Sequence, residues 1–143
     1  MSAPHINLSW FDTSKLRNGA SEPAILDIEQ AVGFRFPESY VSFLRATDGY
    51  EGFVGEGYTS FWTSSELIGA NKDYGFESFV PGYFAIGSDG GGESFGFNSH
   101  SRRFFMVPFI SAGWKDATEV GEDFIELLAR IQNSKLFERA GKE

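Results

Sequence analysis

The chain has 143 residues, a usual size for one domain, and we expect it to fold as a single domain. Its residues are 41% hydrophobic and include 16 phenylalanines, a composition that predicts a Phe-rich core. The chain contains no cysteine, which excludes disulfides and thiolate metal sites. Its net charge of -8 argues against a nucleic-acid binder, because such a protein needs a basic face. The start has no basic segment before an apolar run, and no stretch approaches the roughly 20 apolar residues of a membrane helix. The sequence therefore predicts a cytoplasmic protein.

A pair of short helices is predicted in the first third of the chain. Ser21 has the character of an N-cap, and apolar residues at helical spacing follow it up to the terminator Gly33. Glu29 falls off this apolar stripe. A second helix is predicted to begin at Pro37 and to end near Asp48-Gly49.

The next segments are expected to be less regular. Residues 50–58 carry too much glycine for a helix, and we expect an exposed, mobile loop there. Residues 58–62 are typical of a strand. Residues 64–68 indicate a short capped helix before the polar Asn71-Lys72-Asp73.

Alternating aromatic residues in 83–109 predict a three-stranded antiparallel meander. If Gly90-Gly91 form a two-residue hairpin turn, Ile86 lies opposite Phe95 and Phe84 opposite Phe97. After Gly121-Glu122-Asp123, the apolar spacing in 124–131 predicts a closing helix.

The glycine-dense tract 87–96 has three possible interpretations: a phosphate cradle, a serine nucleophile elbow, or a tight turn. Glu93 stands where a phosphate-binding loop carries lysine, and it repels phosphate. Ser94 fits G-x-S-x-G, but a strand pattern follows it instead of a helix, and no histidine follows Asp116 or Asp123 to complete a triad. We therefore favour a hairpin turn, with a small hydrolase using Ser94 as the third functional hypothesis.

Acidic residues near this tract leave two other chemistries open. Asp89 and Glu93 suit a hard cation such as calcium, but two carboxylates fall short of the six to eight oxygens that calcium prefers. Glu51, Glu56, Asp89 and Glu93 lie near the aromatic residues Tyr50, Tyr58, Trp62 and Tyr83, which is compatible with sugar binding, although loop acids are usually solvated and aromatic residues usually belong to the core. We assign no catalytic residue, cofactor or metal ligand.

The order of these elements resembles that of a known family. Glu29, Gly33, Phe36-Pro37, Tyr40, Phe43-Leu44 and Asp48-Gly49 resemble the N-terminal signature of the Smi1/Knr4 proteins, also called the SUKH superfamily. Residues 81–97 resemble the family's glycine-rich hairpin, Val107-Pro108-Phe109 its next strand, and residues 124–128 its closing helix. The similarity covers about residues 21–131. Phe36 and Asp48 replace the commoner Leu and Asn, and both keep the apolar and turn-forming roles.

The resemblance implies an α+β fold, an antiparallel sheet packed by the N-terminal helix pair and a C-terminal helix. It also implies binding instead of catalysis, because the family has no agreed catalytic residues. Bacterial members are mostly regarded as immunity proteins that neutralise toxins, often nucleases, whereas fungal members act as regulatory scaffolds in cell-wall signalling. We expect an immunity protein with a basic toxin as its partner, and a regulatory scaffold is the alternative. The candidate contacts are Glu51, Glu56, Asp89, Glu93, Tyr50 and Tyr58.

Overall fold

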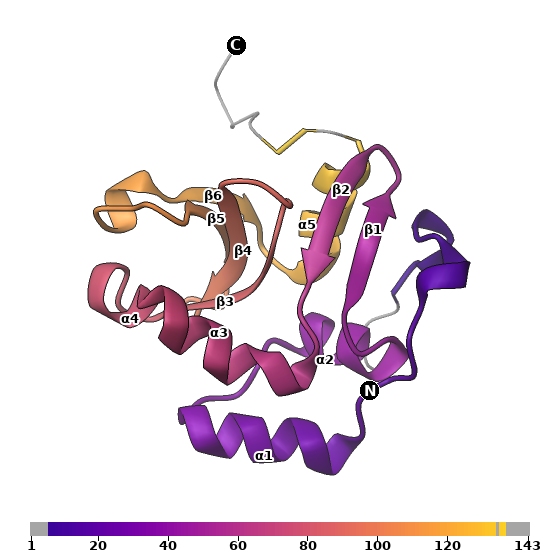
Figure 1. Ribbon diagram of the computed structural model, residues 1–143, viewed down its shortest axis with the longest axis horizontal. Helices are drawn as coiled ribbons and strands as arrows, with labels where there is room; N and C mark the ends of the chain where they lie inside the picture. Colours follow the sequence, from indigo (N-terminus) through magenta and orange to yellow (C-terminus); the bar gives the residue numbers. More distant parts are fainter. Residues whose placement is uncertain (1–5, 134, 137–143) are drawn as a thin grey trace.

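One antiparallel sheet, with its strands in sequence order, organises the molecule (Figure 1). The computed structural model describes residues 6–133, 135 and 136. The single domain predicted from the sequence spans residues 1–143, and its remaining residues lie outside the described part. The six strands found there are β1 (Tyr50–Val54), β2 (Gly57–Phe61), β3 (Tyr83–Ser88), β4 (Glu93–Asn98), β5 (Phe104–Pro108) and β6 (Thr118–Gly121). The predicted meander is confirmed as β3 to β5, and the sheet extends it on both sides.

The predicted helix pair and closing helix are present, and two helices follow β2, where one short helix was predicted at residues 64–68. The described residues form α1 (Glu22–Val32), α2 (Glu38–Ala46), α3 (Leu67–Tyr74), α4 (Phe76–Phe79) and α5 (Phe124–Gln132). The Ser21 hydroxyl caps α1 by accepting from the Ala24 N–H, and Gly33 ends α1 with a φ of 90°. The chain is an α+β protein. No helix in this part of the chain combines the length and apolar character needed to cross a bilayer.

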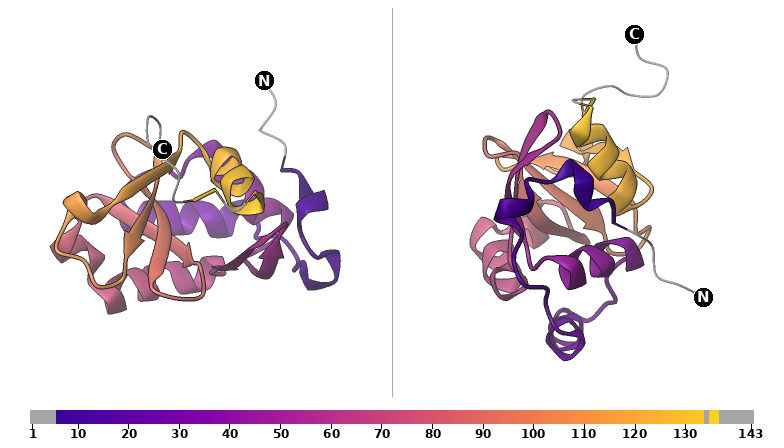
Figure 2. Two further views of the ribbon diagram at one scale, coloured as in Figure 1. Left: turned by 90° about the horizontal axis from the view of Figure 1, so that it is seen from above. Right: turned by 90° about the vertical axis from the view of Figure 1, so that its right-hand side faces the viewer.

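Helices cover both faces of the sheet. Figure 2 places α3 and α4 on one side and α5 on the other. The larger cluster of buried side chains joins α2 and α5 to the sheet, with the rings of Phe43 and Phe124 4.8 Å apart. The smaller cluster lies on the α4 side, where Phe76 packs edge-on against Tyr83 at 5.2 Å. Phenylalanine dominates the larger cluster, as the composition led us to expect.

The prediction of a mobile loop at residues 50–58 is wrong, because this segment forms the β1–β2 hairpin. Its glycines are required by close packing. A Cβ atom on Gly55 would lie 2.5 Å from the Gln132 side chain, and one on Gly57 would lie 2.6 Å from the Ile131 carbonyl oxygen. The end of α5 therefore presses against the hairpin, a contact that local composition does not reveal.

The predicted register of the glycine-rich hairpin is half right. Phe84 pairs with Phe97 as expected, but Phe95 pairs with Gly87 and not with Ile86, because β3 contains a bulge between Ala85 and Gly87. The loop between the strands is correspondingly longer than the two-residue turn that we predicted.

An asparagine from α3 holds this bulge in place. The Asn71 side chain accepts a hydrogen bond from the Ala85 N–H at 2.8 Å and donates one to the Ala85 carbonyl at 2.9 Å. Asn71 lies inside α3, which continues to Tyr74 and is longer than the helix predicted at residues 64–68.

Glu29 is also placed differently from the prediction. Its side chain is buried, and it accepts a hydrogen bond from the Phe36 N–H at 2.7 Å and pairs with Arg35 at 3.3 Å. The carboxylate thus ties α1 to the segment before α2, which explains why an acid occupies an inward position.

Candidate functional site

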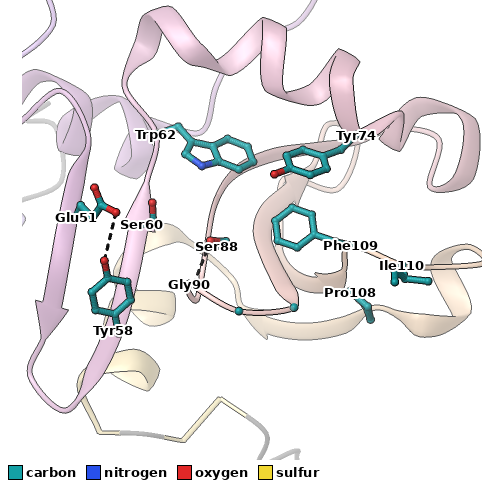
Figure 3. Close-up of a pocket in the computed structure, with 12 residues that line it drawn as sticks. Glu51, Tyr58, Ser60, Trp62, Tyr74, Ser88, Gly90, Pro108, Phe109 and Ile110 are labelled. Atoms are coloured by element: carbon teal, nitrogen blue, oxygen red, sulfur yellow. Dashed lines mark hydrogen bonds between the residues drawn. The ribbon is translucent and has the colours of Figure 1, made fainter.

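An open hollow lies where β1 and β2, the end of α3, the glycine-rich turn and the end of β5 meet (Figure 3). Its volume is about 540 Å³, within the range of roughly 300–1,000 Å³ that is common for binding sites. We call it the aromatic hollow. It is lined by Glu51, Tyr58, Ser60, Trp62, Tyr74, Ser88, Gly90, Gly91, Gly92, Pro108, Phe109 and Ile110.

Aromatic rings form one side of the aromatic hollow. Trp62 and Tyr74 are nearly parallel, with an interplanar angle of 10° and ring centroids 6.1 Å apart. The Phe109 ring lies 4.5 Å from that of Tyr74. Tyr74 is 48% exposed and the neighbouring Ile110 is 96% exposed. This side therefore exposes apolar surface.

Polar side chains form the opposite side and the floor. Ser60 in β2 pairs with Glu51 in β1 and with Ser88 in β3, so all three side chains share one face of the sheet. The Tyr58 hydroxyl donates to Glu51 Oε2 at 3.3 Å. Loss of water around the phenol and the nearby Glu51 carboxylate raise the pKa of Tyr58, which keeps this hydroxyl protonated.

Glu51 is the one charged residue among those that line the aromatic hollow. Across the described residues, ion pairs join Arg35 to Glu29, Arg103 to Glu119 and Arg130 to Glu126, and none involves Glu51. Its charge is thus not neutralised by any of these ion pairs, and the hydrogen bond to its carboxylate comes from Tyr58.

The glycine-rich turn provides acceptors for the N–H groups of Gly90, Gly91 and Glu93. Gly90 donates to Ser88 Oγ at 3.1 Å, and Gly91 and Glu93 donate to Asp89 Oδ1 at 2.8 and 3.2 Å. A phosphate cradle needs such groups directed at the ligand. Here the Asp89 carboxylate accepts the hydrogen bonds that a bound phosphate would accept in a cradle. The tract is therefore a turn and not a phosphate cradle.

The acids of the turn do not form a cation site of three or more ligands. No group of at least three His, Asp or Glu side chains that could hold a metal occurs in the part of the chain described here. Loss of water and the neighbouring Asp89 carboxylate raise the pKa of Glu93. The two acids therefore repel each other.

Ser94 does not lie on a nucleophile elbow. It is fully buried in β4, where its hydroxyl donates to the Val107 carbonyl at 2.8 Å and lies 2.7 Å from the Tyr83 hydroxyl. His100 follows the far end of β4. The geometry that a Ser94 hydrolase requires is absent from these contacts.

The structure separates the six candidate contact residues. Glu51 and Tyr58 line the aromatic hollow, and Asp89 and Glu93 flank its glycines. Glu56 is exposed in the β1–β2 turn, where its N–H donates to the Gln132 carbonyl.

Tyr50 was wrongly included as a surface contact. Its side chain is fully buried, its hydroxyl donates to the Phe53 carbonyl at 2.6 Å and accepts from the Asp12 N–H at 2.8 Å, and its ring packs edge-on against Phe11. Tyr50 is a core residue.

Sequence reasoning missed most of the other lining residues. Ser60 shares an outward face with Tyr58 by strand alternation, a signal that was available. Tyr74 and Ile110 are brought in by the path of the chain, and no local pattern marks them. Glycoside chemistry needs two carboxylates around the scissile bond, and Glu51 alone lines the aromatic hollow.

The helix pair, the six-stranded meander and the closing helix define a small α+β domain with an open hollow on one face of its sheet. The chain belongs to the SMI1 / KNR4 family (SUKH-1), whose model matches residues 19–130. This confirms the resemblance seen in the sequence. A comparison with curated proteins gives no significant match.

Proposed function

We propose that this protein is a non-enzymatic binding domain, an immunity protein that binds a bacterial toxin and neutralises it. Membership of the SMI1 / KNR4 family supports the general assignment. The proposal places the protein in the cytoplasm, which suits a chain with Cys 0.

The observation that carries the proposal is the composition of the aromatic hollow. It combines exposed apolar side chains, notably Tyr74 and Ile110, with the carboxylate of Glu51, and no basic residue lines it. Aromatic anchors supply much of the affinity at protein interfaces, and complementary charge speeds association and selects the partner. Such a surface favours a partner that is basic and partly apolar.

A toxin that acts on nucleic acid fits this description. A nuclease needs a basic surface to neutralise phosphates. An acidic protein that covers this surface blocks the substrate without performing chemistry. The net charge of -8 strengthens the attraction at long range.

The test is co-expression with each toxin domain encoded beside this gene. We expect one toxin to arrest growth alone, and we expect the wild-type protein to restore growth and to co-purify with that toxin. The double variant Glu51→Lys/Ile110→Ser should lose both effects, since it reverses the charge of the lining and removes the most exposed apolar side chain.

A matched control is Asp27→Lys, which reverses an exposed charge on α1 outside the aromatic hollow. It should rescue like the wild type. If no neighbouring toxin is neutralised, the immunity proposal fails and the regulatory scaffold becomes the better account.

A further inference from the structure

We propose that the aromatic hollow receives an arginine side chain of the protein partner, with the guanidinium held between the Glu51 carboxylate and the rings of Trp62 and Tyr74. This inference rests on the proposed function, because it names the chemistry by which the same surface recognises its partner.

The two sides of the aromatic hollow suit the two properties of a guanidinium group. Figure 3 shows Glu51 and Tyr58 on one side and the rings of Trp62, Tyr74 and Phe109 on the other. A guanidinium is flat and can stack on an aromatic face while its edge donates hydrogen bonds to a carboxylate. An arginine that enters between the two sides meets both.

Charge supports a cation and excludes an anion. Glu51 is the charged residue of the lining, and no described basic residue pairs with it. The N–H groups of Gly90 and Gly91 are already bound to Ser88 and Asp89, so the turn offers them to no anion. Asp89 and Glu93 beside the glycines add to the negative potential.

The floor of the aromatic hollow provides further acceptors. The hydroxyls of Ser60 and Ser88 lie on the same face as Glu51, by the register of β1, β2 and β3. Each hydroxyl oxygen carries two lone pairs. A guanidinium has five N–H donors, so it can bind these hydroxyl oxygens in addition to the two carboxylate oxygens. An ammonium has three donors and uses fewer of these acceptors.

Arginine is therefore preferred to lysine. The ammonium of lysine is compact and strongly hydrated, so moving it against the rings costs more desolvation. The nearly parallel faces of Trp62 and Tyr74, at 10°, match a planar group and give no comparable advantage to a tetrahedral one.

The experiment uses three peptides of the form acetyl-Gly-X-Gly-amide, where X is arginine, citrulline or lysine. Citrulline has nearly the shape of arginine without its charge. Each peptide is titrated into the full chain, and the indole N–H of Trp62 is followed by nuclear magnetic resonance. We expect the arginine peptide to bind roughly tenfold more tightly than the citrulline peptide and more tightly than the lysine peptide.

Two variants locate the binding. Glu51→Gln should weaken the arginine peptide by roughly tenfold and remove its advantage over citrulline. Tyr74→Leu should weaken it while the fold is retained, because this side chain is 48% exposed. Asp27→Asn is the control, an exposed acid on α1 outside the lining, and should change nothing. Unchanged spectra outside the aromatic hollow would verify folding in each case.

Equal binding of arginine and citrulline peptides, or arginine binding unaffected by Glu51→Gln, overturns the inference. The result is independent of the toxin experiment. Rescue of growth without arginine selectivity refutes this inference alone, whereas arginine selectivity without rescue by any neighbouring toxin refutes the immunity function and leaves the arginine site standing.

Discussion

Gly90 is the residue at which the glycine-rich turn meets the β1–β2 hairpin. Its φ is +83°, a conformation that residues with a side chain rarely adopt, and a Cβ atom there would lie 2.8 Å from Tyr58 Cδ2. The glycine thus serves the turn and the shape of the aromatic hollow together. Gly92 differs, because a Cβ atom there would meet nothing within 4 Å.

This contrast gives a stability prediction. Gly90→Ala should lower the free energy of unfolding by about 1–2 kcal/mol, through backbone strain and contact with the Tyr58 ring. Gly92→Ala should have an effect near zero. Urea denaturation of both variants measures the difference, and equal losses would contradict our account of the turn.

Glu93 gives a pH prediction with a definite sign. Since its pKa is raised in the folded protein by loss of water and by Asp89, the folded state holds this proton more tightly than the unfolded state. Stability from this group is therefore greatest in acid and decreases as the pH rises from the ordinary glutamate pKa through the raised one.

Glu93→Gln should remove this dependence. We expect the variant to be more stable than the wild type at about pH 8 and to lose most of that advantage at about pH 3, where Glu93 is protonated in both states. Thermal unfolding of both proteins across this range measures it. A constant difference at all pH values would contradict a raised pKa of Glu93 in the folded protein.

At the scale of elements, α3 and β3 depend on each other through Asn71. Its side chain takes the place of a neighbouring strand for Ala85, and it also donates to the Leu67 carbonyl within α3. The bulge in β3 and the position of Tyr74, at the end of α3, are fixed by the same residue.

Asn71→Leu should therefore destabilise the protein by about 2–3 kcal/mol, because the Ala85 N–H and carbonyl lose their partner in a partly buried place. It should also shift the resonances of Tyr74 and Trp62. Lys72→Ala, an exposed substitution on the same helix, should cost little. Equal effects of the two substitutions in chemical denaturation would be evidence against this role of Asn71.

The elements that the sequence predicted best carry their signals locally. Ser21 and Gly33 define both ends of α1, and Asp123 caps α5 by accepting from the Glu126 N–H at 2.9 Å. The strand predicted at residues 58–62 is present as β2, but β1 and the turn before β2 were missed. The glycines of this hairpin are required by packing against Ile131 and Gln132, more than 70 residues away in the chain.

The candidate site was predictable in the same partial way. Glu51 and Tyr58 could be predicted from the sequence, since acidic and aromatic residues near glycine-rich segments are typical of binding surfaces. Tyr50 was named for the same reason and proved to be core, because strand alternation turns it inward when Glu51 turns outward. Tyr74 and Ile110 join the site through the sheet order and the length of α3, which only the tertiary structure provides.

For the whole molecule, the net charge of -8 predicts how partner binding responds to salt. Attraction between an acidic protein and a basic toxin is screened as ionic strength rises. We expect the association rate to fall by roughly tenfold between low and high salt, with a smaller change in the dissociation rate. Surface plasmon resonance measures both rates, and an association rate independent of salt would argue for a partner without a basic surface.

We expect the aromatic hollow to be the surface that binds the partner. The most direct measurement compares the affinity of the neutralised toxin domain for two charge-reversal variants of this protein. One is Glu51→Lys within the aromatic hollow, and the other is Asp27→Lys on α1. We predict that Glu51→Lys weakens binding by at least about tenfold beyond the loss caused by Asp27→Lys, which reports only the change in net charge. Equal losses from the two substitutions would contradict the claim and place the interface elsewhere on the molecule.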